Sequence, residues 1–324
     1  MDVQFPKVAV VANWFGKPLQ YFQLWLDSCA RNPCITWMLF CDFSTDQYIV
    51  PSNVRVLQSS VASMRDRLQK HFAFPIRYAK AWDLCAFRPA FGSIFKDELV
   101  GYDYWGWCDC DVIFGDLSPC ISELAKKPCK LLPKGHLSFV RNDSLLNEYI
   151  ISHGAMKQAV ALSSSGLPCF DEVGFSKDVL HPKGEVVALG LPFVNLYCRA
   201  GSFVAYDTEA LCRALGVAGP GIKYPFVMTW VNGVLKAHFA IRGEVRDIEL
   251  LYVHFFKREM RCIDYNSNQS AYLIKPNQIL PYNGHGLSVY EILWLDRPRV
   301  HWKYFFKRMT LDKLLQKFYK VLGR

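Results

Sequence analysis

The sequence of 324 residues lacks the features that mark several large classes of protein. It contains no uninterrupted apolar run of the ~18 residues that a membrane-spanning helix requires. Its first residues lack the basic segment, the long apolar stretch and the cleavage site of a secretory signal, so we expect a cytoplasmic protein. It has no internal repeat, no low-complexity stretch and no excess of glycine or proline. Apolar residues make up 51% of the chain, which predicts a folded protein with a sizeable core rather than a disordered one.

The twelve cysteines form no Cys-x-x-Cys pair and are scattered through apolar segments. Structural zinc sites use closely spaced cysteine pairs, and disulfides belong mainly to exported proteins. We therefore expect these cysteines to be reduced residues of the core, and we expect neither a disulfide framework nor a zinc site.

The positive charge is concentrated at the end of the chain. Residues 301–324 contain seven basic residues and one acid, so this segment carries +6 of the formal net charge of +9. A nearly balanced body argues against a nucleic-acid-binding protein. Apolar residues in 301–324 recur mainly at three- and four-residue steps, with most lysines between them, which is typical of a helix lying on an anionic membrane surface. The alternative is a helix that packs its apolar stripe on the body or on a partner.

Apolar runs alternate with helical patterns from the start of the chain. The strands expected first are 7–13, 36–42, 54–57 and 102–107, and the helices between them are 19–30, 60–72 and 88–99. This order predicts an α/β fold with a mostly parallel central sheet flanked by helices. The pattern weakens after residue 260. We therefore expect a catalytic domain over 1–260 and an extension over 261–324 that ends in the basic helix 301–324.

Two carboxylates, Asp109 and Asp111, follow the very apolar strand that contains Trp105 and Trp107. In open α/β sheets, ligands bind at the carboxyl edge, where such a strand ends. Residues i and i+2 of an ideal strand share one face, and paired carboxylates suit Mg²⁺ or Mn²⁺ with room left for substrate phosphates. The alternative is a pair of turn carboxylates that cap the helix near residue 118. The two tryptophans are more typical of a core than of a sugar-binding platform.

Further blocks in order along the chain accompany this motif. They are 13–22, 26–32, 81–92, 101–111, 114–116, 135–142, 170–172 and 252–258. Together they resemble the Rossmann-like GT-A glycosyltransferase superfamily and, more closely, a bacterial DUF6625-like family of sugar-nucleotide-dependent transferases of surface polysaccharide synthesis. The sequence departs from the family pattern at Ala86, where an aspartate is usual, and at Arg88, where lysine is frequent.

The resemblance implies a metal-dependent glycosyltransferase with Mn²⁺ or Mg²⁺ as cofactor. Its donor would be a nucleoside diphosphate hexose, with UDP-galactose or UDP-glucose favoured. Its acceptor would be a carbohydrate or lipid-linked glycan of the growing capsule, O-antigen or lipopolysaccharide. The protein would touch the anionic inner membrane peripherally, at its cytoplasmic face, through 301–324. The alternative is a catalytically degenerate protein of the same fold that binds a carbohydrate or a nucleotide sugar.

The resemblance also implies roles for single residues. The metal ligands would be Asp109, Asp111 and His254. The nucleotide and donor contacts would come from Asn13, Phe15, Gly16, Lys17, Asp83, Arg88 and Lys257, the last of these at the leaving diphosphate. Asp171 and Glu172 would supply the catalytic base for the acceptor hydroxyl, and His136 and Arg141 would contact substrate. Ordinary structural roles are the alternatives: a core histidine, an ion pair on a helix, or an acidic helix cap.

Overall fold

The computed structural model describes most of the chain, in several segments. These are residues 5–78, 80–161, 170–196, 205–206, 208–217, 222, 224–255, 260–262 and 270–296. The chain divides into two compact units. The first comprises Met1–Leu191, Asn232–Leu235 and Leu250–His254, and the second comprises Pro192–Val231, Lys236–Glu249 and Phe255–Arg324. The catalytic-domain boundary expected at residue 260 stays a prediction.

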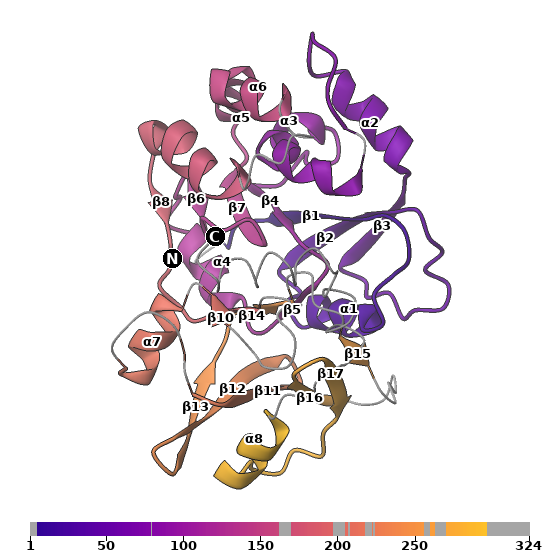
Figure 1. The fold of residues 1–324 in the computed structure, drawn as a ribbon. Coiled ribbons are helices and arrows are strands. Elements are labelled where there is room, and N and C mark those ends of the chain that lie inside the picture. Colours follow the sequence, from indigo (N-terminus) through magenta and orange to yellow (C-terminus); the bar gives the residue numbers. More distant parts are fainter. Residues whose placement is uncertain are drawn as a thin grey trace, which may run out of the picture. The chain divides into compact units, whose positions relative to one another are not determined.

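The first unit is built on a seven-stranded sheet with the strand order β3-β2-β1-β4-β7-β6-β8 (Figure 1). Its strands are β1 (Val8–Trp14), β2 (Ile35–Cys41), β3 (Val54–Gln58), β4 (Tyr104–Cys108), β6 (Lys130–Leu131), β7 (Leu137–Arg141) and β8 (Val186–Val187). Pairing is parallel from β3 through β2 and β1 to β4, and again between β6 and β8. Only β7 runs antiparallel to its neighbours β4 and β6. The predicted α/β class with a mostly parallel central sheet is therefore confirmed.

Helices cover both faces of this sheet (Figure 1). They are α1 (Phe22–Ala30), α2 (Val61–Gln69), α3 (Phe91–Ile94), α4 (Ser118–Leu124), α5 (Ser144–Ser152) and α6 (Gly154–Ala161), with the 3₁₀ segments η1 (Ala81–Ala90) and η4 (His181–Lys183) and the π-helical segment η3 (Phe170–Leu180). The face toward α2, α3, α5 and α6 forms a large apolar core, in which Trp105 and Trp107 of β4 are fully buried. A buried sheet with both faces covered accounts for the nearly continuous apolar runs in the sequence.

The helix expected over 88–99 begins earlier and in another form. Residues 81–90 form the 3₁₀ segment η1, and a short α-helix follows. Pro89 lies inside η1, where it supplies no backbone N–H donor, so a regular α-helical ladder is interrupted at this point. The Asp83 carboxylate accepts a hydrogen bond from the Lys80 backbone N–H at 2.9 Å and so caps the start of η1.

Close packing in β4 requires a glycine. A Cβ atom at Gly106 would lie 2.2 Å from the Ser138 carbonyl oxygen of the neighbouring strand β7. The tryptophans on either side each donate an indole N–H within the core, Trp105 to Asn147 and Trp107 to the Gly135 carbonyl. Their interpretation as core residues is confirmed, and β4 is held rigidly up to the point where the two carboxylates follow.

A second pairing in the first unit joins distant parts of the sequence. Strand β5 (Val112–Phe114) is antiparallel to β14 (Tyr252–His254), and His254 lies directly opposite Val112. The turn after β5 is fixed by Asn32, whose amide donates to the Gly115 carbonyl and accepts from the Leu117 N–H. The register therefore brings His254 next to Asp111.

The second unit is mainly antiparallel. Its larger sheet has the order β13-β12-β11-β16-β17-β15, formed by β11 (Phe226–Val231), β12 (Val234–Ile241), β13 (Glu244–Glu249), β15 (Arg261–Cys262), β16 (Ala271–Lys275) and β17 (Gln278–Pro281). The remaining elements are β9 (Val194–Leu196), which pairs with β10 (Ala205–Tyr206), and the helices α7 (Glu209–Leu215) and α8 (Val289–Leu295). Helix α7 runs to Leu215 and ends at Gly216, whose φ of 65° is the left-handed conformation that favours glycine at a helix end.

No helix in the described segments is long and apolar enough to cross a bilayer. The basic helix expected over 301–324 lies outside the described residues, so that expectation stays a prediction. Ten cysteines fall within the described part of the chain. All ten are free, and most of them are buried.

Candidate metal centre

The carboxyl end of β4 carries the two aspartates that the sequence singled out. Strand β4 ends at Cys108, so Asp109 and Asp111 lie in the short loop before β5 rather than in a continuous strand. Buried Cys110 lies between them, and the Asp109 N–H donates to the His136 carbonyl at 3.1 Å. The loop is thus fixed at its middle residue and by its backbone, while both carboxylates remain about one-fifth exposed.

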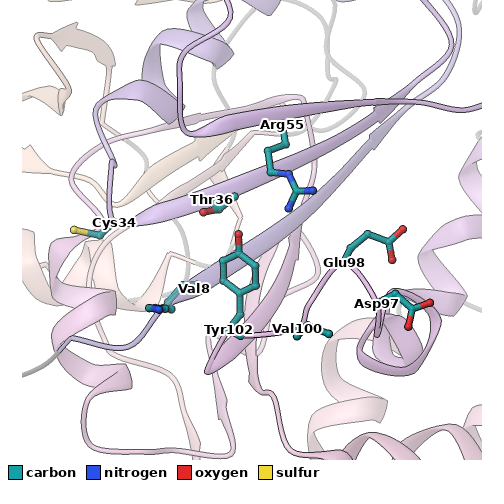
Figure 2. A pocket seen from close by; sticks show the side chains of 10 residues that line it. Val8, Cys34, Thr36, Arg55, Asp97, Glu98, Val100 and Tyr102 are labelled. Carbon is teal, nitrogen blue, oxygen red and sulfur yellow. The ribbon is translucent and has the colours of Figure 1, made fainter.

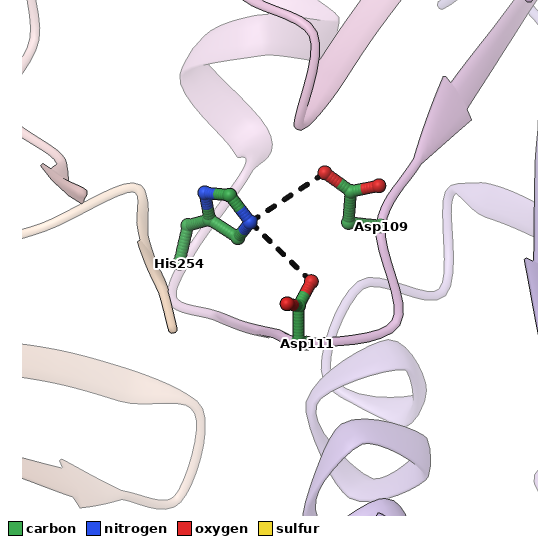
Figure 3. Close-up of side chains that lie close together, drawn as sticks. All are labelled: Asp109, Asp111 and His254. Atoms are coloured by element: carbon green, nitrogen blue, oxygen red, sulfur yellow. Dashed lines mark ion pairs between the residues drawn. The ribbon is translucent and has the colours of Figure 1, made fainter. Parts of the chain in front are cut away.

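Three ligand-type atoms converge at this loop (Figure 3). The His254 Nε2 atom lies 3.6 Å from Asp109 Oδ2 and 3.3 Å from Asp111 Oδ1. One ligand atom from each of these three residues lies within 4.8 Å of the others. The predicted metal ligands are therefore brought together from two segments far apart in the sequence.

The charges at this cluster depend on one another. Burial by itself raises the pKa of Asp111, but the charge and hydrogen bond of His254 outweigh it, so this pKa lies below its usual value. Burial by itself lowers the pKa of His254, but Asp111 and Asp109 together raise it above its usual value. The two carboxylates therefore make a positive charge favourable at this position. A metal ion that binds here would supply such a charge.

The donor set fits a divalent cation. It combines two hard carboxylate oxygens with one imidazole nitrogen, and both are ligand types that divalent cations use in proteins. Asp109 uses Oδ1 for Arg88 and directs Oδ2 toward His254, so one of its oxygens remains available to a metal. The residues present can therefore hold such an ion without losing the neighbouring ion pair.

Arg88 connects this cluster to a second acidic residue. Its guanidinium pairs with Asp109 through Nη2, and through Nη1 it donates to Asp171 Oδ2 at 3.1 Å and to the Gly135 carbonyl at 3.0 Å. The side chain is only 13% exposed. Burial by itself lowers the pKa of Arg88, but Asp109 and Asp171 raise it well above its usual value, so the guanidinium is a permanent charge.

The predicted catalytic carboxylates lie next to this arginine. Asp171 and Glu172 begin η3, and Asp171 is buried. Burial raises the pKa of Asp171 above its usual value, although Arg88 opposes the shift. A Cβ atom at Gly135 would lie 2.9 Å from Asp171 Oδ2 and 3.1 Å from Glu172 Oε1, so only a glycine allows this approach. Asp171 therefore lies beside the metal cluster, with Arg88 between them.

His136, the other predicted substrate residue of this region, is 3% exposed. Its ring lies 4.7 Å from the His254 ring and 5.2 Å from the Tyr252 ring, centroid to centroid. Burial first, and then the positive charge of His254, lower the pKa of His136 well below its usual value, so this imidazole is neutral. It lies behind the His254 ring, where it packs against a proposed metal ligand.

The loop after β1 lies at the same carboxyl edge as β4, because the two strands are parallel neighbours. Within the described residues, the Asn13 Oδ1 atom is buried and accepts no hydrogen bond. Phe15 packs against the core, and the Gly16 N–H donates to Asp42 Oδ1 at 2.7 Å. Lys17 is exposed, and its carbonyl accepts a hydrogen bond from the Trp14 indole at 3.0 Å. An unused buried acceptor at this edge is what a ligand with N–H or O–H donors would satisfy.

Sequence reasoning missed two residues of this region. Asp42 lies directly after β2 and fixes the Gly16 loop. The sequence signal that could have indicated Asp42 is an acidic residue immediately after an apolar strand. Lys130 is fully buried in β6 and donates to Ser176 of η3 at 2.9 Å. No local pattern distinguishes it from a surface lysine.

The other predicted site residues have different positions. Asp83 is buried and serves as the cap of η1. Arg141 lies opposite Tyr104 in the β4–β7 register, whereas Leu137 lies opposite Cys108, next to the metal cluster. Four residues of strand, about 13 Å, therefore separate Arg141 from that edge, and it is not part of the site described here. Lys257 lies outside the described residues.

A pocket of about 570 Å³ opens at the opposite, amino-terminal edge of the parallel strands (Figure 2). Lys7 and Val8 at the start of β1, Thr36 of β2 and Arg55 of β3 line it, together with residues 97–98 and 100–102 before β4. None of the predicted site residues that the structure describes lines this pocket. The seven residues of β1 put it about 20 Å from the carboxyl edge.

A comparison with protein-family models gives a match over most of the chain. A model of a family of unknown function, DUF6625, matches residues 10–283. No curated protein matches the chain significantly in sequence.

Two glycosyltransferases are among the solved structures that are similar, both with low scores. One is galactosyltransferase LgtC in complex with donor and acceptor sugar analogues, with a TM-score of 0.31 and 10% identity over 48% of this chain and 65% of that chain. The other is a glycosyltransferase involved in the glycosylation of the major capsid of PBCV-1, with a TM-score of 0.35 and 10% identity over 77% of this chain and 93% of that chain. The chain spans just under two thirds of LgtC, and neither likeness is close enough to carry a conclusion about activity.

Proposed function

The chain belongs to DUF6625, a family of unknown function, and from the geometry of its site we propose that it is a metal-dependent glycosyltransferase. It would move a hexose from a nucleoside diphosphate sugar, with a UDP-sugar favoured, to a hydroxyl of a carbohydrate acceptor. The observation that carries this proposal is the convergence of Asp109, Asp111 and His254 at the carboxyl edge of a mostly parallel sheet. That edge is where open α/β sheets bind their ligands.

Asp109, Asp111 and His254 would hold the ion, for which we propose Mn²⁺. When bound, such a cation neutralises the negative charge that develops on the diphosphate leaving group. Two carboxylates with one imidazole leave coordination positions open for the phosphate oxygens of a donor. Lys257 follows β14 by three residues in sequence, and we propose that its ammonium adds to the same charge stabilisation.

We assign the nucleotide to the loop after β1. The buried Asn13 Oδ1 atom would accept a hydrogen bond from the base, and the Gly16–Asp42 hydrogen bond fixes the loop beside the sheet edge. Asp42 offers its second carboxylate oxygen to a ribose hydroxyl, as an acid after a strand does in other nucleotide-binding α/β folds. Phe15 and Lys17 would contact the nucleotide from the same loop.

The acceptor would approach Asp171 and Glu172. Its hydroxyl must lose a proton as it attacks, and a carboxylate with a raised pKa is the better base. Burial gives Asp171 this property, while Arg88 keeps the carboxylate oriented toward the metal cluster. Arg88 would also provide a fixed positive charge beside the transferring sugar.

The finer features of the proposal come from the sequence. A growing bacterial surface glycan as acceptor follows from the resemblance stated above. Peripheral attachment at the cytoplasmic face of the inner membrane rests on the charge and spacing of 301–324. Both are compatible with an enzyme that extends a lipid-linked chain.

One observation favours a second candidate, a binding protein without turnover. Arg88 occupies one oxygen of Asp109 and one of Asp171, and the neighbouring position in η1 is Ala86, where the resembled family has a carboxylate. Such a protein would bind a nucleotide sugar but would not transfer the sugar.

Thermal shift of the purified protein with nucleoside diphosphates and nucleotide sugars, each with and without Mn²⁺, tests the proposal. A ligand at a hundredfold excess over its dissociation constant stabilises the folded state by ~2.7 kcal/mol. The transferase predicts a metal-dependent shift with one nucleotide family and release of the nucleoside diphosphate in the presence of acceptor. A shift without release supports the binding protein, and no shift with any donor contradicts both.

A further inference from the structure

Lys130 is a charged residue in a fully enclosed position. Its relative exposure is 0%, and its ammonium lies 5.1 Å from the centroid of the Trp107 ring and 5.0 Å from that of Phe175. The Nζ atom donates to Ser176 Oγ at 2.9 Å and faces the Asp171 carbonyl oxygen at 3.4 Å. Each of these contacts except that with Trp107 of β4 is made with η3.

An enclosed lysine costs folding free energy. Burial lowers the pKa of Lys130 to about 7, against the opposing effect of the Asp171 and Glu172 carboxylates. Methionine could fill the same space without a charge to desolvate, so the amine is not explained by packing.

The contacts of Lys130 concern the segment that carries the proposed base. Arg88 of η1 binds the side chain of Asp171, whereas Lys130 of β6 faces its backbone carbonyl and binds Ser176 five residues on. The two cations therefore approach the start of η3 from separate elements, one at the carboxylate and one at the main chain. A π-helical segment of this length is rare, so we expect η3 to depend on such external contacts.

We infer that Lys130 is a positioning residue that fixes the start of η3, and with it the Asp171 carboxylate, relative to the metal cluster. It touches neither donor nor acceptor and acts through Asp171. The effect of Lys130 on catalysis rests on the proposed function, whereas its effect on the structure of η3 does not. It assigns to β6 a part in the site that no sequence motif indicates.

Hydrogen–deuterium exchange tests the structural part without any activity. In Lys130→Met, amide exchange of peptides within 170–180 should become at least ~10-fold faster, while peptides of β1 and β2 keep their wild-type rates. The matched control is Lys275→Met, which removes the other lysine that is buried among the described residues, in β16. Unchanged exchange in 170–180, or an equal increase throughout the first unit, would overturn the inference.

Kinetics tests the catalytic part. Lys130→Met should lower kcat by about 10-fold or more while the KM for the nucleotide sugar and the Mn²⁺ concentration for half activation stay within about 2-fold, because the donor and metal groups lie on other elements. Lys275→Met should leave all three values unchanged. A loss of donor affinity equal to the loss of kcat would contradict a positioning role.

A second variant covers the case in which Lys130→Met does not fold. Ser176→Ala keeps the lysine and removes its hydroxyl acceptor, so exchange in 170–180 should rise about 3-fold and kcat should fall by a similar factor. If the wild-type protein transfers no sugar, the proposed function fails, and the exchange measurements still decide whether Lys130 fixes η3. If transfer is present but neither variant changes exchange, the role of Lys130 fails alone.

Discussion

The two edges of the seven-stranded sheet both gather charged side chains, but they arrange them differently. At the carboxyl edge, Arg88, Asp171 and His254 have side chains between 5% and 13% exposed, and they pair with one another or with Asp109. At the amino-terminal edge, Arg55 and Asp97 are exposed around an open pocket of about 570 Å³.

This difference shows that a cavity in the surface does not by itself indicate where the chemistry takes place. Exposed charges are screened by water and contribute little free energy, whereas buried charges act strongly on one another and shift each other's pKa values. Among the described residues of the two edges, only those of the carboxyl edge combine largely buried carboxylates, a permanent cation and an imidazole within ligand distance. The pocket at the amino-terminal edge is therefore not where the chemistry is expected.

The largest contrast between the two edges should come from removing a carboxylate at each. Asp111→Asn should reduce sugar transfer by at least about 1,000-fold, because stabilisation by the metal contributes several kcal/mol. The matched change at the other edge, Asp97→Asn, should leave transfer within about 2-fold of wild type, since exposed charges contribute little. Steady-state assay of nucleoside diphosphate release measures both, with circular dichroism to verify folding. Equal activity of the two variants would contradict the metal role.

The arginines of the two edges provide the next comparison. Arg88→Met leaves Asp109 and Asp171 without their cation in a buried setting, and we expect a loss of about 3–5 kcal/mol in the free energy of unfolding. Arg55→Met should change it by less than about 0.5 kcal/mol. Urea unfolding followed by tryptophan fluorescence measures both values. A stable Arg88→Met protein would show that the bridge is weaker than its burial implies.

Strand β4 connects the two edges, and its middle residue tolerates no side chain. Gly106→Ala would put a Cβ atom against the Ser138 carbonyl oxygen, and we expect a loss of about 2–3 kcal/mol from the strain. Gly154→Ala, at the start of α6, meets nothing within 4 Å and should be neutral or slightly stabilising. Thermal unfolding of the two variants is the measurement. Equal stability would mean that β4 and β7 can separate without cost.

The last expected effect concerns pH. The pKa of Lys130 is about 7 in the folded protein, below the ordinary lysine value of 10.5. Between these values the unfolded chain binds one more proton, so this residue makes stability rise with pH from about 7 to about 10 and contributes no slope below pH 7.

Lys130→Met removes that contribution. Over this window the wild-type free energy of unfolding should rise by about 1.4 kcal/mol per pH unit more than that of Lys130→Met. Urea unfolding at several pH values measures the difference. Parallel pH profiles for the two proteins would mean that Lys130 keeps its ordinary pKa in the fold.

The amino-terminal half of the sheet was predictable from the sequence because its signals are local. Strands β1, β2, β3 and β4 are short apolar runs bounded by turns or helical patterns, and each lies within two residues of its expected position. The second unit was largely missed. Asn232-Gly233 between two apolar runs is a typical hairpin signal and would have predicted the β11–β12 turn, where both residues have positive φ.

The site was predictable in its motif but not in its network. Asp109 and Asp111 are separated by one residue and follow a strand, so their position at the sheet edge could be inferred. The contacts of Arg88 with Asp171, and of Lys130 with Ser176, join residues 83 and 46 positions apart. No periodicity encodes such pairs, because they depend on how the helices pack on the sheet. Burial, which gives these charges their effect, is likewise a property of the folded chain alone.

The measurement that tests the central claim most directly is Mn²⁺ binding followed by electron paramagnetic resonance. The wild-type protein and Asp97→Asn should each bind one Mn²⁺ per chain with the same affinity, and Asp111→Asn should bind it at least about 100-fold more weakly. Equal Mn²⁺ affinity in the wild-type protein and Asp111→Asn, or loss of binding only in Asp97→Asn, would contradict the assignment of the metal centre to the carboxyl edge.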